Sequence, residues 1–364
     1  MRAKFSIFSA VFGLQVACAS ALTIQLDYTY DASTDNFFAQ NATARAAVER
    51  AATDLSAALT GPLNPVATDQ YTGTNGSTSL TFDWALLFEN PSVEGSQIRL
   101  DNFAFSNDVV TIFVGMRPLL GTTLGEGGPA GVAFSARSQG PSNTINSELP
   151  GAVDAAEAAS NIAMTRGAGP VTGSLNGSFS VPDSSYDLRY GALAGTLWFD
   201  NDTNNDGIVD TAATLANSWH FNAASSVATG KNDFYSVALH EMLHAIGYGV
   251  SDTWESNVSS TSWLGPNAVA LNNGSGANLL SSDSAHLRSG LVSPRLTDGV
   301  LQEVVMDPTL TVGSRKLLTQ MDFAILRDLG YTTVPEPATA ALLAIGGVAL
   351  LSRRTHRRTS RYLL

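Results

Sequence analysis

The chain contains almost no cysteine. Among its 364 residues there is one, Cys18, and it falls in an N-terminal segment that we expect to be removed. Disulfide bonds therefore cannot brace the mature protein, and no thiolate can bind a metal or act as a nucleophile. Any chemistry has to use imidazole, carboxylate, hydroxyl or amine groups.

Positive charge is also scarce, because 20 Lys and Arg residues face 32 Asp and Glu residues and the net charge is −12. Two of the cations lie in residues 1–21 and five lie in residues 338–364, and neither segment holds an acidic residue. Without both ends, the net charge of residues 22–337 falls from −12 to −19. So acidic a surface argues against nucleic acids and anionic membranes as partners, and we expect a soluble monomer.

The one long apolar segment outside the N-terminus, residues 338–352, is shorter than the ~20 residues that a stable membrane span needs. The arginines that follow it would hold its end on the cytoplasmic side. We expect it to hold the chain at the membrane transiently, and a permanent C-terminal transmembrane anchor is the alternative. At the other end, residues 1–21 follow Arg2 and Lys4 with an apolar run and then small residues, which is the order of a secretory signal peptide.

Val334-Pro335-Glu336-Pro337, the apolar segment and the arginine cluster together resemble the PEP-CTERM sorting signal of exopolysaccharide-producing Gram-negative bacteria. The resemblance implies that residues 334–364 are a sorting tail and that an exosortase removes it at the outer surface. With the signal peptide, it predicts an exported protein that is extracellular or held at the cell surface.

Between these ends, hydrophobic periodicity predicts both strands and helices. We expect strands over residues 22–30, 77–89, 108–119 and 192–200, and helices over residues 41–61, 150–164 and 317–330. Residues 120–150 and the stretch after residue 164 are rich in Gly, Ser or Pro, so we expect both to be loops. This order predicts one α+β domain over residues 22–333.

Two of the five histidines, His240 and His244, stand four residues apart in the stretch NDFYSVALHEMLHAIGYGV. Asn232 or Asp233 can cap a helix at its start, and Gly247 can end the helix in a left-handed turn. Both histidines then lie ~40° apart on one face of the helix. The opposite face is expected in the core, and its residues are Phe234, Ala238, Met242 and Ala245.

The pattern is H-E-x-x-H, which supplies two imidazole ligands for one zinc ion and a carboxylate beside them. A third protein ligand leaves a fourth position for water, whose pKa zinc lowers to ~7. Glu241 can accept a proton from this water and pass it to a leaving amine. The pattern therefore predicts a zinc-dependent hydrolase that cleaves peptide bonds.

The continuation HEMLHAIG resembles the metzincin zinc proteases, whose motif runs H-E-x-x-H-x-x-G-x-x-H. Gly247 matches the glycine of that motif, whereas Val250 stands where its third histidine is expected. The order of His286 and Met306 resembles the leishmanolysin branch, which has an insertion before the third histidine, and also matrixin-like bacterial proteins with PEP-CTERM tails. The resemblance implies that His286 is the third zinc ligand and that Met306 forms an apolar floor beneath the metal.

The same resemblance implies a zincin-like α+β fold. A mixed twisted sheet would pack on an N-terminal helix and on the active-site helix, with the Met-turn and a C-terminal helix below the cleft. His240 and His244 would be zinc ligands, Glu241 the general base, and a protein or peptide the substrate. We expect an edge strand near residues 193–199 to pair with the extended substrate backbone.

Two alternatives stay open. The third ligand can be acidic, as in the gluzincins, and the candidates are Asp252, Glu255, Asp283 and Glu303. The chain can also be a non-catalytic zincin-fold protein that binds at the cell surface or in the extracellular matrix. Glu241 separates these functions, because a structural zinc site needs no base there. We expect His220 to be a hydrogen-bonded structural histidine.

An acidic loop precedes the histidine helix. It repeats the first half of an EF-hand calcium loop with Asp202, Asn204, Asp206 and Gly207. Asp210 follows, but Ala213 stands at the twelfth position, where an EF-hand has its bidentate glutamate. Two interpretations remain, a Ca²⁺ site that stiffens the loop or a solvated Asn/Asp turn.

Overall fold

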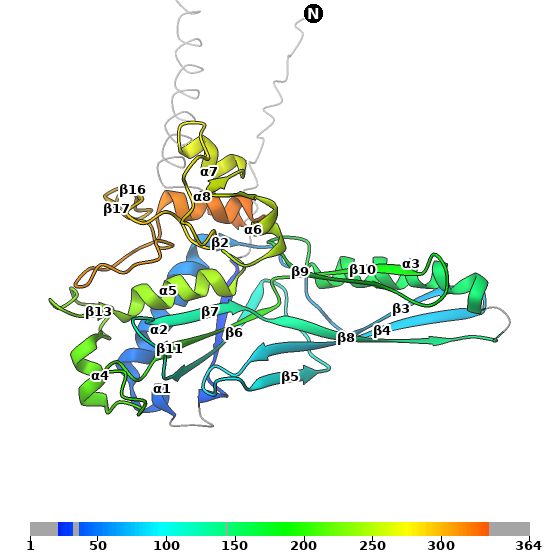
Figure 1. Cartoon of the computed structure of the whole chain (residues 1–364), viewed down its shortest axis with the longest axis horizontal. Coiled ribbons are helices and arrows are strands. Elements are labelled where there is room, and N and C mark those ends of the chain that lie inside the picture. Colours follow the sequence, from blue (N-terminus) through cyan, green and yellow to red (C-terminus); the bar gives the residue numbers. More distant parts are fainter. Residues whose placement is uncertain (1–20, 32–35, 143–144, 335–364) are drawn as a thin grey trace, which may run out of the picture.

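The computed structural model describes residues 21–31, 36–142 and 145–334. Residues 1–20 of the expected signal peptide (1–21) and residues 335–364 of the expected sorting tail (334–364) lie outside the described residues. The described chain is mixed α and β with several sheets, and its buried side chains form two hydrophobic clusters. Figure 1 shows the corresponding two parts, a helix-covered sheet with α2 and α5 and an arm that extends to the right.

A four-stranded mixed sheet forms the centre of the first part. Its order is β1 (Thr23–Asp27), β6 (Val109–Arg117), β11 (Ala194–Asp200) and β7 (Gly125–Pro129). The first three strands are parallel, and β7 runs antiparallel to β11 at the edge of the sheet. Three strand predictions are confirmed here, but β11 is an inner strand. The expectation that residues 193–199 form the edge is therefore wrong, because β7 covers that side.

Two helices pack on this sheet and on each other. α2 (Ala42–Ala58) contacts β1, and α5 (Phe234–Ala245) contacts β7 and β11. The buried face of α2 consists mainly of alanines, which let the two helices approach closely. α2 ends before the predicted Gly61 because Leu59 is already extended and begins β2 (Leu59–Thr60). Asn41 makes no side-chain cap for α2; its amide donates instead to the carbonyl oxygen of Phe37 (3.0 Å).

β2 ties the two ends of the folded chain together. Thr60 pairs with Ala21, and it also pairs with Thr332 of β18 (Thr332–Thr333). The amide of Val334 donates to the carbonyl oxygen of Ala58 (3.1 Å). The chain therefore enters and leaves its fold at one place.

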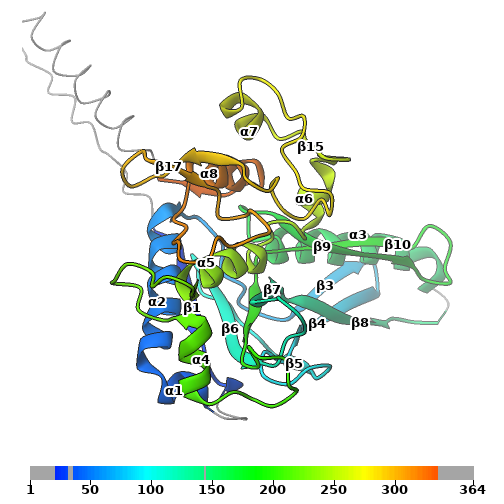
Figure 2. The ribbon, with the colours of Figure 1, turned by 60° about the vertical axis from the view of Figure 1, so that its left-hand side comes forward.

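The arm is built on a second, antiparallel sheet in which the long strand β4 is central. Its strands are β3 (Gln70–Asn75), β4 (Thr78–Glu89), β5 (Gln97–Asp101) and β8 (Gly131–Gln139). α3 (Ile145–Met164) packs on β3 and β4, and it also contacts a hairpin of β9 (Val171–Ser178) and β10 (Ser185–Gly191). Figure 2 shows α3 and this hairpin together on one side of β3, β4 and β8.

The arm contradicts both loop predictions. Residues 120–150 contain β7, β8 and the first turn of α3, and β9 and β10 follow residue 164. α3 begins before the predicted residue 150 because the Glu148 carboxylate accepts hydrogen bonds from Ser77 and Thr78, which fix its first turns on the neighbouring β3–β4 turn. The helix then continues through Pro150.

The last long helix, α8 (Gln320–Asp328), lies within the predicted residues 317–330. It begins at a capping box made by Thr319 and Asp322, and Gly330 follows it with a left-handed φ of 97°. α8 packs against α7 (Pro266–Leu271) in the insertion after the histidine helix. Within the described residues no helix has the length and apolar character to span a membrane; the predicted anchor at residues 338–352 lies outside them.

Short elements connect these parts. They are α1 (Phe37–Gln40), α4 (Ala212–Ser218), β12 (Trp219–His220), β13 (Asn232–Asp233), α6 (Asp252–Ser256), β14 (Val258–Ser259), β15 (Ser262–Trp263), β16 (Val292–Pro294) and β17 (Leu301–Glu303).

Candidate metal centre

α5 carries the two predicted histidines on a firmly held helix. Its cap is Asp233, whose carboxylate accepts hydrogen bonds from the amide and hydroxyl of Ser236 (3.2 and 2.7 Å). Arg315 forks onto the same carboxylate (2.9 and 2.7 Å), so the start of the helix is tied to a segment far along the chain. Gly247 ends it with a φ of 104°. The four residues predicted for the core face, Phe234, Ala238, Met242 and Ala245, are all buried.

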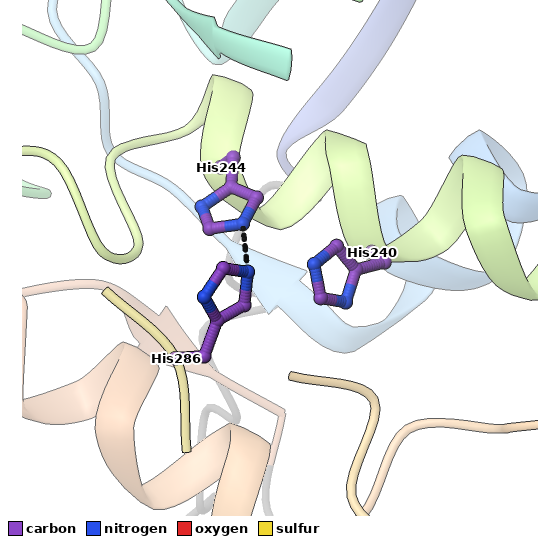
Figure 3. Close-up of side chains that lie close together, drawn as sticks. All are labelled: His240, His244 and His286. Carbon is purple, nitrogen blue, oxygen red and sulfur yellow. Dashed lines mark hydrogen bonds between the residues drawn. The ribbon is translucent and has the colours of Figure 1, made fainter. Parts of the chain in front are cut away.

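Three imidazoles converge in front of α5. His240 and His244 lie one turn apart on the helix, and His286 reaches them from the loop between α7 and β16 (Figure 3). One nitrogen from each ring lies within 4.8 Å of the other two. The ring centroids are 4.9 to 5.1 Å apart. The structure therefore brings together the three residues that the sequence proposed as ligands.

Each ring is oriented by a hydrogen bond at Nδ1. Nδ1 of His240 lies 2.9 Å from the carbonyl oxygen of Val305, and Nδ1 of His244 lies 2.8 Å from the carbonyl oxygen of Tyr248. A carbonyl oxygen only accepts, so Nδ1 carries the proton in both rings and Nε2 keeps a free lone pair. His286 follows the same rule, because its Nδ1 lies 2.9 Å from a carboxylate oxygen of Asp283.

The free nitrogens fit a cation. Nε2 of His244 and Nε2 of His286 are 3.1 Å apart and share a hydrogen bond (dashed in Figure 3), so a proton or a metal cation has to lie between their lone pairs. A tetrahedral zinc ion with Zn–N distances of ~2.0–2.1 Å separates its ligand nitrogens by about 3.3 Å. The donor set and its spacing therefore suit zinc.

Burial keeps the helix histidines neutral. Desolvation, followed by the neighbouring rings, holds the pKa of His240 well below its ordinary value. Desolvation and His286 lower the pKa of His244 to about 4. Neutral imidazole is the form that binds metals, so both rings are ready to do so at neutral pH.

Glu241 lies beside this cluster and is buried, with 6% of its surface exposed. Burial, and next to it the charge of Glu126, raise the pKa of Glu241 to about 8. Among the described residues, no group donates a hydrogen bond to its carboxylate. A buried carboxylate without a donor holds a proton readily, which is the property of a general base near neutral pH.

Two glycines let the edge strand lie directly against this part of α5. A Cβ on Gly127 would lie 2.5 Å from the carbonyl oxygen of Glu241, and one on Gly125 would lie 2.9 Å from the side chain of Val237. Both positions therefore need glycine for close approach rather than for flexibility. The sequence predicts no role for these two glycines, although the glycine-rich run GEGGP marks their position.

A buried carboxylate on α8 supports the first histidine. Asp322 accepts hydrogen bonds from the amides of Val305 (3.2 Å) and Met306 (3.4 Å), which fixes the turn whose carbonyl oxygen holds His240. Met306 is fully buried in the core cluster, and its carbonyl oxygen accepts from the amide of Leu287, the residue after His286. One turn thus braces both sides of the cluster. Asp322 was not predicted as a supporting residue, and its signal in the sequence is the T-x-x-D capping box.

The loop that carries His286 is organised by Asp283. Its carboxylate accepts from the hydroxyl of Ser281 and from the amides of Ala285 (2.9 Å) and His286 (3.2 Å), as well as meeting the imidazole. Desolvation alone would raise its pKa, but these hydrogen bonds hold the pKa at about 2. Asp283, one of the acidic candidates, therefore lies behind the third histidine rather than among the converging nitrogens.

The other acidic candidates lie elsewhere. Asp252 bonds the hydroxyl of Ser174 (2.7 Å), and Glu303 lies 3.4 Å from the ammonium of Lys316. In the described ranges no carboxylate, Glu255 included, belongs to the metal-ligand group of the three histidines. Val250 is 42% exposed on the wall of the cleft.

The acidic loop and His220 use their polar groups locally. The carboxylate of Asp202 accepts from the amides of Asp206 (3.1 Å) and Gly207 (2.8 Å), and Asp210 bonds Thr203 and Asn204. The described residues bring no three carboxylates of this loop into a metal-ligand group, so calcium stays a prediction. His220 contacts the carbonyl oxygen of Asn222 (3.0 Å) and the hydroxyl of Ser225 (3.2 Å), as expected for a structural histidine.

The histidines and Glu241 open into a cleft of about 940 Å³. Residues 121–127, which lead into and form β7, line one wall, and residues 305–312 after the Met306 turn contribute to another. α5 provides the floor with its histidine face. The cleft therefore lies between β7 and the segment after Met306, with the histidine cluster at its floor.

Comparison with known proteins informs the tail. No curated protein and no solved structure matches the chain. Residues 333–358 match the family model described as the PEP-CTERM protein-sorting motif. This chain therefore carries the C-terminal sorting tail of an exported protein that an exosortase processes.

Proposed function

We propose that the chain is an exported, zinc-dependent endopeptidase. The observation that carries the proposal is the convergence of three imidazoles, each held by a hydrogen bond at Nδ1 and each with one nitrogen within 4.8 Å of the other two, beside a buried carboxylate in an open cleft. His240, His244 and His286 would hold the zinc ion. A zinc ion with three protein ligands supplies a Lewis acid that lowers the pKa of water to ~7 and polarises a carbonyl group.

Glu241 supplies the proton transfer. Its carboxylate, buried beside the histidines, would take a proton from the attacking water and then give it to the leaving amine. The carbon–nitrogen bond breaks, and one product keeps the new carboxyl group. No group donates to Glu241 within the described residues, so no hydrogen bond needs to be broken first.

The edge strand β7 supports an extended polypeptide as substrate. It has one strand partner, β11, and its other edge lies along the cleft. An extended chain can add to such an edge through main-chain hydrogen bonds, which recognise any sequence. The substrate class we propose is therefore protein or peptide.

The layout of these elements also supports a zincin-like fold of the metzincin type. A mixed sheet with an antiparallel edge strand packs on two helices, one of which carries H-E-x-x-H. A tight turn with buried Met306 and a capped helix follow the third histidine.

The competing function is a zinc-holding surface or matrix protein without turnover. Both functions require the three histidines, but only catalysis requires Glu241. We would load the protein and its Glu241→Ala and His286→Ala variants with zinc, and measure metal content and cleavage of casein. Glu241→Ala should keep the metal and lose cleavage, and His286→Ala should lose the metal. Cleavage by Glu241→Ala at the parent rate would refute the enzymatic function.

A further inference from the structure

Glu126 is the only charged side chain on the edge strand β7, whose sequence is GEGGP. On its neighbours Gly125 and Gly127, the position that a Cβ atom would occupy faces α5. Since successive side chains of a strand point to opposite faces, the side chain of Glu126 projects from the face of the sheet that is turned away from α5. Glu126 can therefore contact the side chains that a polypeptide paired with β7 places on that face.

A fixed platform holds the Glu126 carboxylate. Trp198 of β11 lies directly across from Glu126, and its indole nitrogen donates to the carboxylate (3.2 Å). The guanidinium of Arg117 stacks 3.9 Å above the ring of Trp198 and lies 3.7 Å from the same carboxylate. Arg117 pairs more closely with Glu89, at 2.6 Å. Two carboxylates thus share one cation, and the group keeps a negative charge.

Glu126 is also the accessible charge of the cleft wall. Half of its side chain is exposed. The other charged residues that line the cleft, apart from the histidines, are buried, and they are Asp200, Glu241, Asp307 and Lys316. The ammonium of Lys316 lies 3.4 Å from Glu303. Among the described residues that line the cleft, a substrate along β7 therefore meets one exposed negative side chain and no exposed positive side chain.

We propose that Glu126 makes this site selective for polypeptides with a lysine or arginine at one position. A chain that pairs with the free edge of β7 places the residue opposite Glu126 on the same face, with the Cβ atoms ~5 Å apart. Trp198 occupies the equivalent place on the inner side, so the carboxylate lies between the indole and the incoming side chain. The inference rests on the proposed function, because it assumes that substrates bind along β7.

Half-exposed charge pairs contribute modestly, so we expect a roughly fivefold preference. Cleavage of casein by the zinc-loaded protein would first be mapped by mass spectrometry. The best-cut peptide would then be made with lysine or norleucine at each position, to compare kcat/KM values. The lysine-to-norleucine ratio should reach about 5 at one position and fall toward 1 in Glu126→Gln. In Glu126→Lys the same position should prefer glutamate. The ratio should also shrink as salt is added.

Glu94 provides the matched control, because it is an exposed glutamate that does not line the cleft. Glu94→Gln removes the same charge from the whole molecule and should keep the parent ratio. If both glutamine variants lower the ratio equally, net charge explains the preference and the role of Glu126 is refuted. A ratio of 1 at every position in the parent also refutes it.

A binding measurement separates this inference from the proposed function. Zinc-loaded Glu241→Ala would be titrated with a fluorescein-labelled peptide of alternating alanine and lysine, and with its norleucine counterpart, by anisotropy. Tighter binding of the lysine peptide that disappears in Glu241→Ala/Glu126→Gln supports the inference even if the parent cuts nothing. Equal binding of both peptides overturns it, whatever the cleavage assay gives. Absence of cleavage by the zinc-loaded parent counts against the proposed function alone.

Discussion

Asp283 and His286 form a carboxylate–imidazole pair, with Oδ2 and Nδ1 2.9 Å apart. The two histidines of α5 have neutral carbonyl groups in the same place, so the third ring is the one whose partner carries a charge. This pair holds the ring from a loop, whereas a helix holds the other two. It makes His286 the histidine of the cluster whose position depends most on a charged partner.

We expect Asp283→Asn to weaken zinc binding by roughly 10- to 100-fold, because partners behind metal ligands typically contribute this much. Competition with a chromogenic chelator would give the affinity. Asp252→Asn is the control, since Asp252 bonds Ser174 and contacts no histidine. An unchanged affinity in Asp283→Asn, or a loss of metal in Asp252→Asn, would contradict the arrangement described here.

Removal of zinc should destabilise the protein. A ligand at 100 times its Kd stabilises the folded state by about 2.7 kcal/mol, which for a chain of this size is a shift in Tm of about 5 °C. EDTA should lower Tm by about this amount and added zinc should restore it. His286→Ala, whose cluster is incomplete, should respond to neither. Equal Tm shifts in parent and variant would place the zinc effect outside the three histidines.

The contact between β7 and α5 should tolerate no side chain at residue 127. Gly127→Ala places a Cβ 2.5 Å from the carbonyl oxygen of Glu241, so the helix or strand must move, at a cost of about 1–3 kcal/mol in the free energy of unfolding. Gly128 lies next to it on the same strand, and a Cβ there would meet nothing within 4 Å. Urea unfolding should show a large loss for Gly127→Ala and little change for Gly128→Ala. Equal losses would indicate a general effect of glycine replacement in the strand.

Alkaline pH should destabilise the fold through its buried tyrosines. Burial raises the pKa of Tyr331 and, together with Asp54, that of Tyr235, above the ordinary value of 10.0. The folded state thus favours the neutral phenols, so their stabilisation is complete below pH 10 and is lost as pH rises toward the folded-state pKa values. Each group should contribute about 1.4 kcal/mol per pH unit in that range.

Unfolding by urea from about pH 8 to about pH 11 would measure this dependence. Tyr331→Phe removes one titrating group and its hydrogen bond to the carbonyl oxygen of Ile246. It should lower the free energy of unfolding at neutral pH. Above pH 10 it should reduce the slope of that free energy against pH by the contribution of one ionising group. An unchanged slope would mean that Tyr331 ionises as readily in the folded state as in the unfolded state.

The sequence predicted α5 and the shared face of its two histidines because their signals are local. Asp233 caps the helix, Gly247 ends it, and the buried and ligand-bearing faces follow from one helical period. His286 is predicted only by the resemblance to the metzincins, because nothing local in the sequence relates it to α5. Its partner Asp283 was considered, but in the role of a ligand, because the direction in which a loop carboxylate points depends on the packing of the whole insertion.

Glycine explains why the stretch after residue 164 was wrongly predicted to be a loop. In β9 and β10, Gly173 pairs with Tyr190 and Gly177 pairs with Tyr186 across the hairpin, and the tyrosine rings fill the space above each glycine. Such glycines contribute no side-chain packing of their own to the strand, so in a single sequence they resemble loop residues. Their role depends on a partner strand that local periodicity does not reveal.

The pairing of Thr60 with both Ala21 and Thr332 has a practical consequence for this protein. Because Ala21 and Thr332 both pair with Thr60, a short linker can join the chain at these two residues, and new termini can be opened in an exposed turn. A circularly permuted chain would keep β2 paired on both sides. A segment fused to the new termini would leave the fold at a different place relative to the cleft, and the histidines would be unchanged.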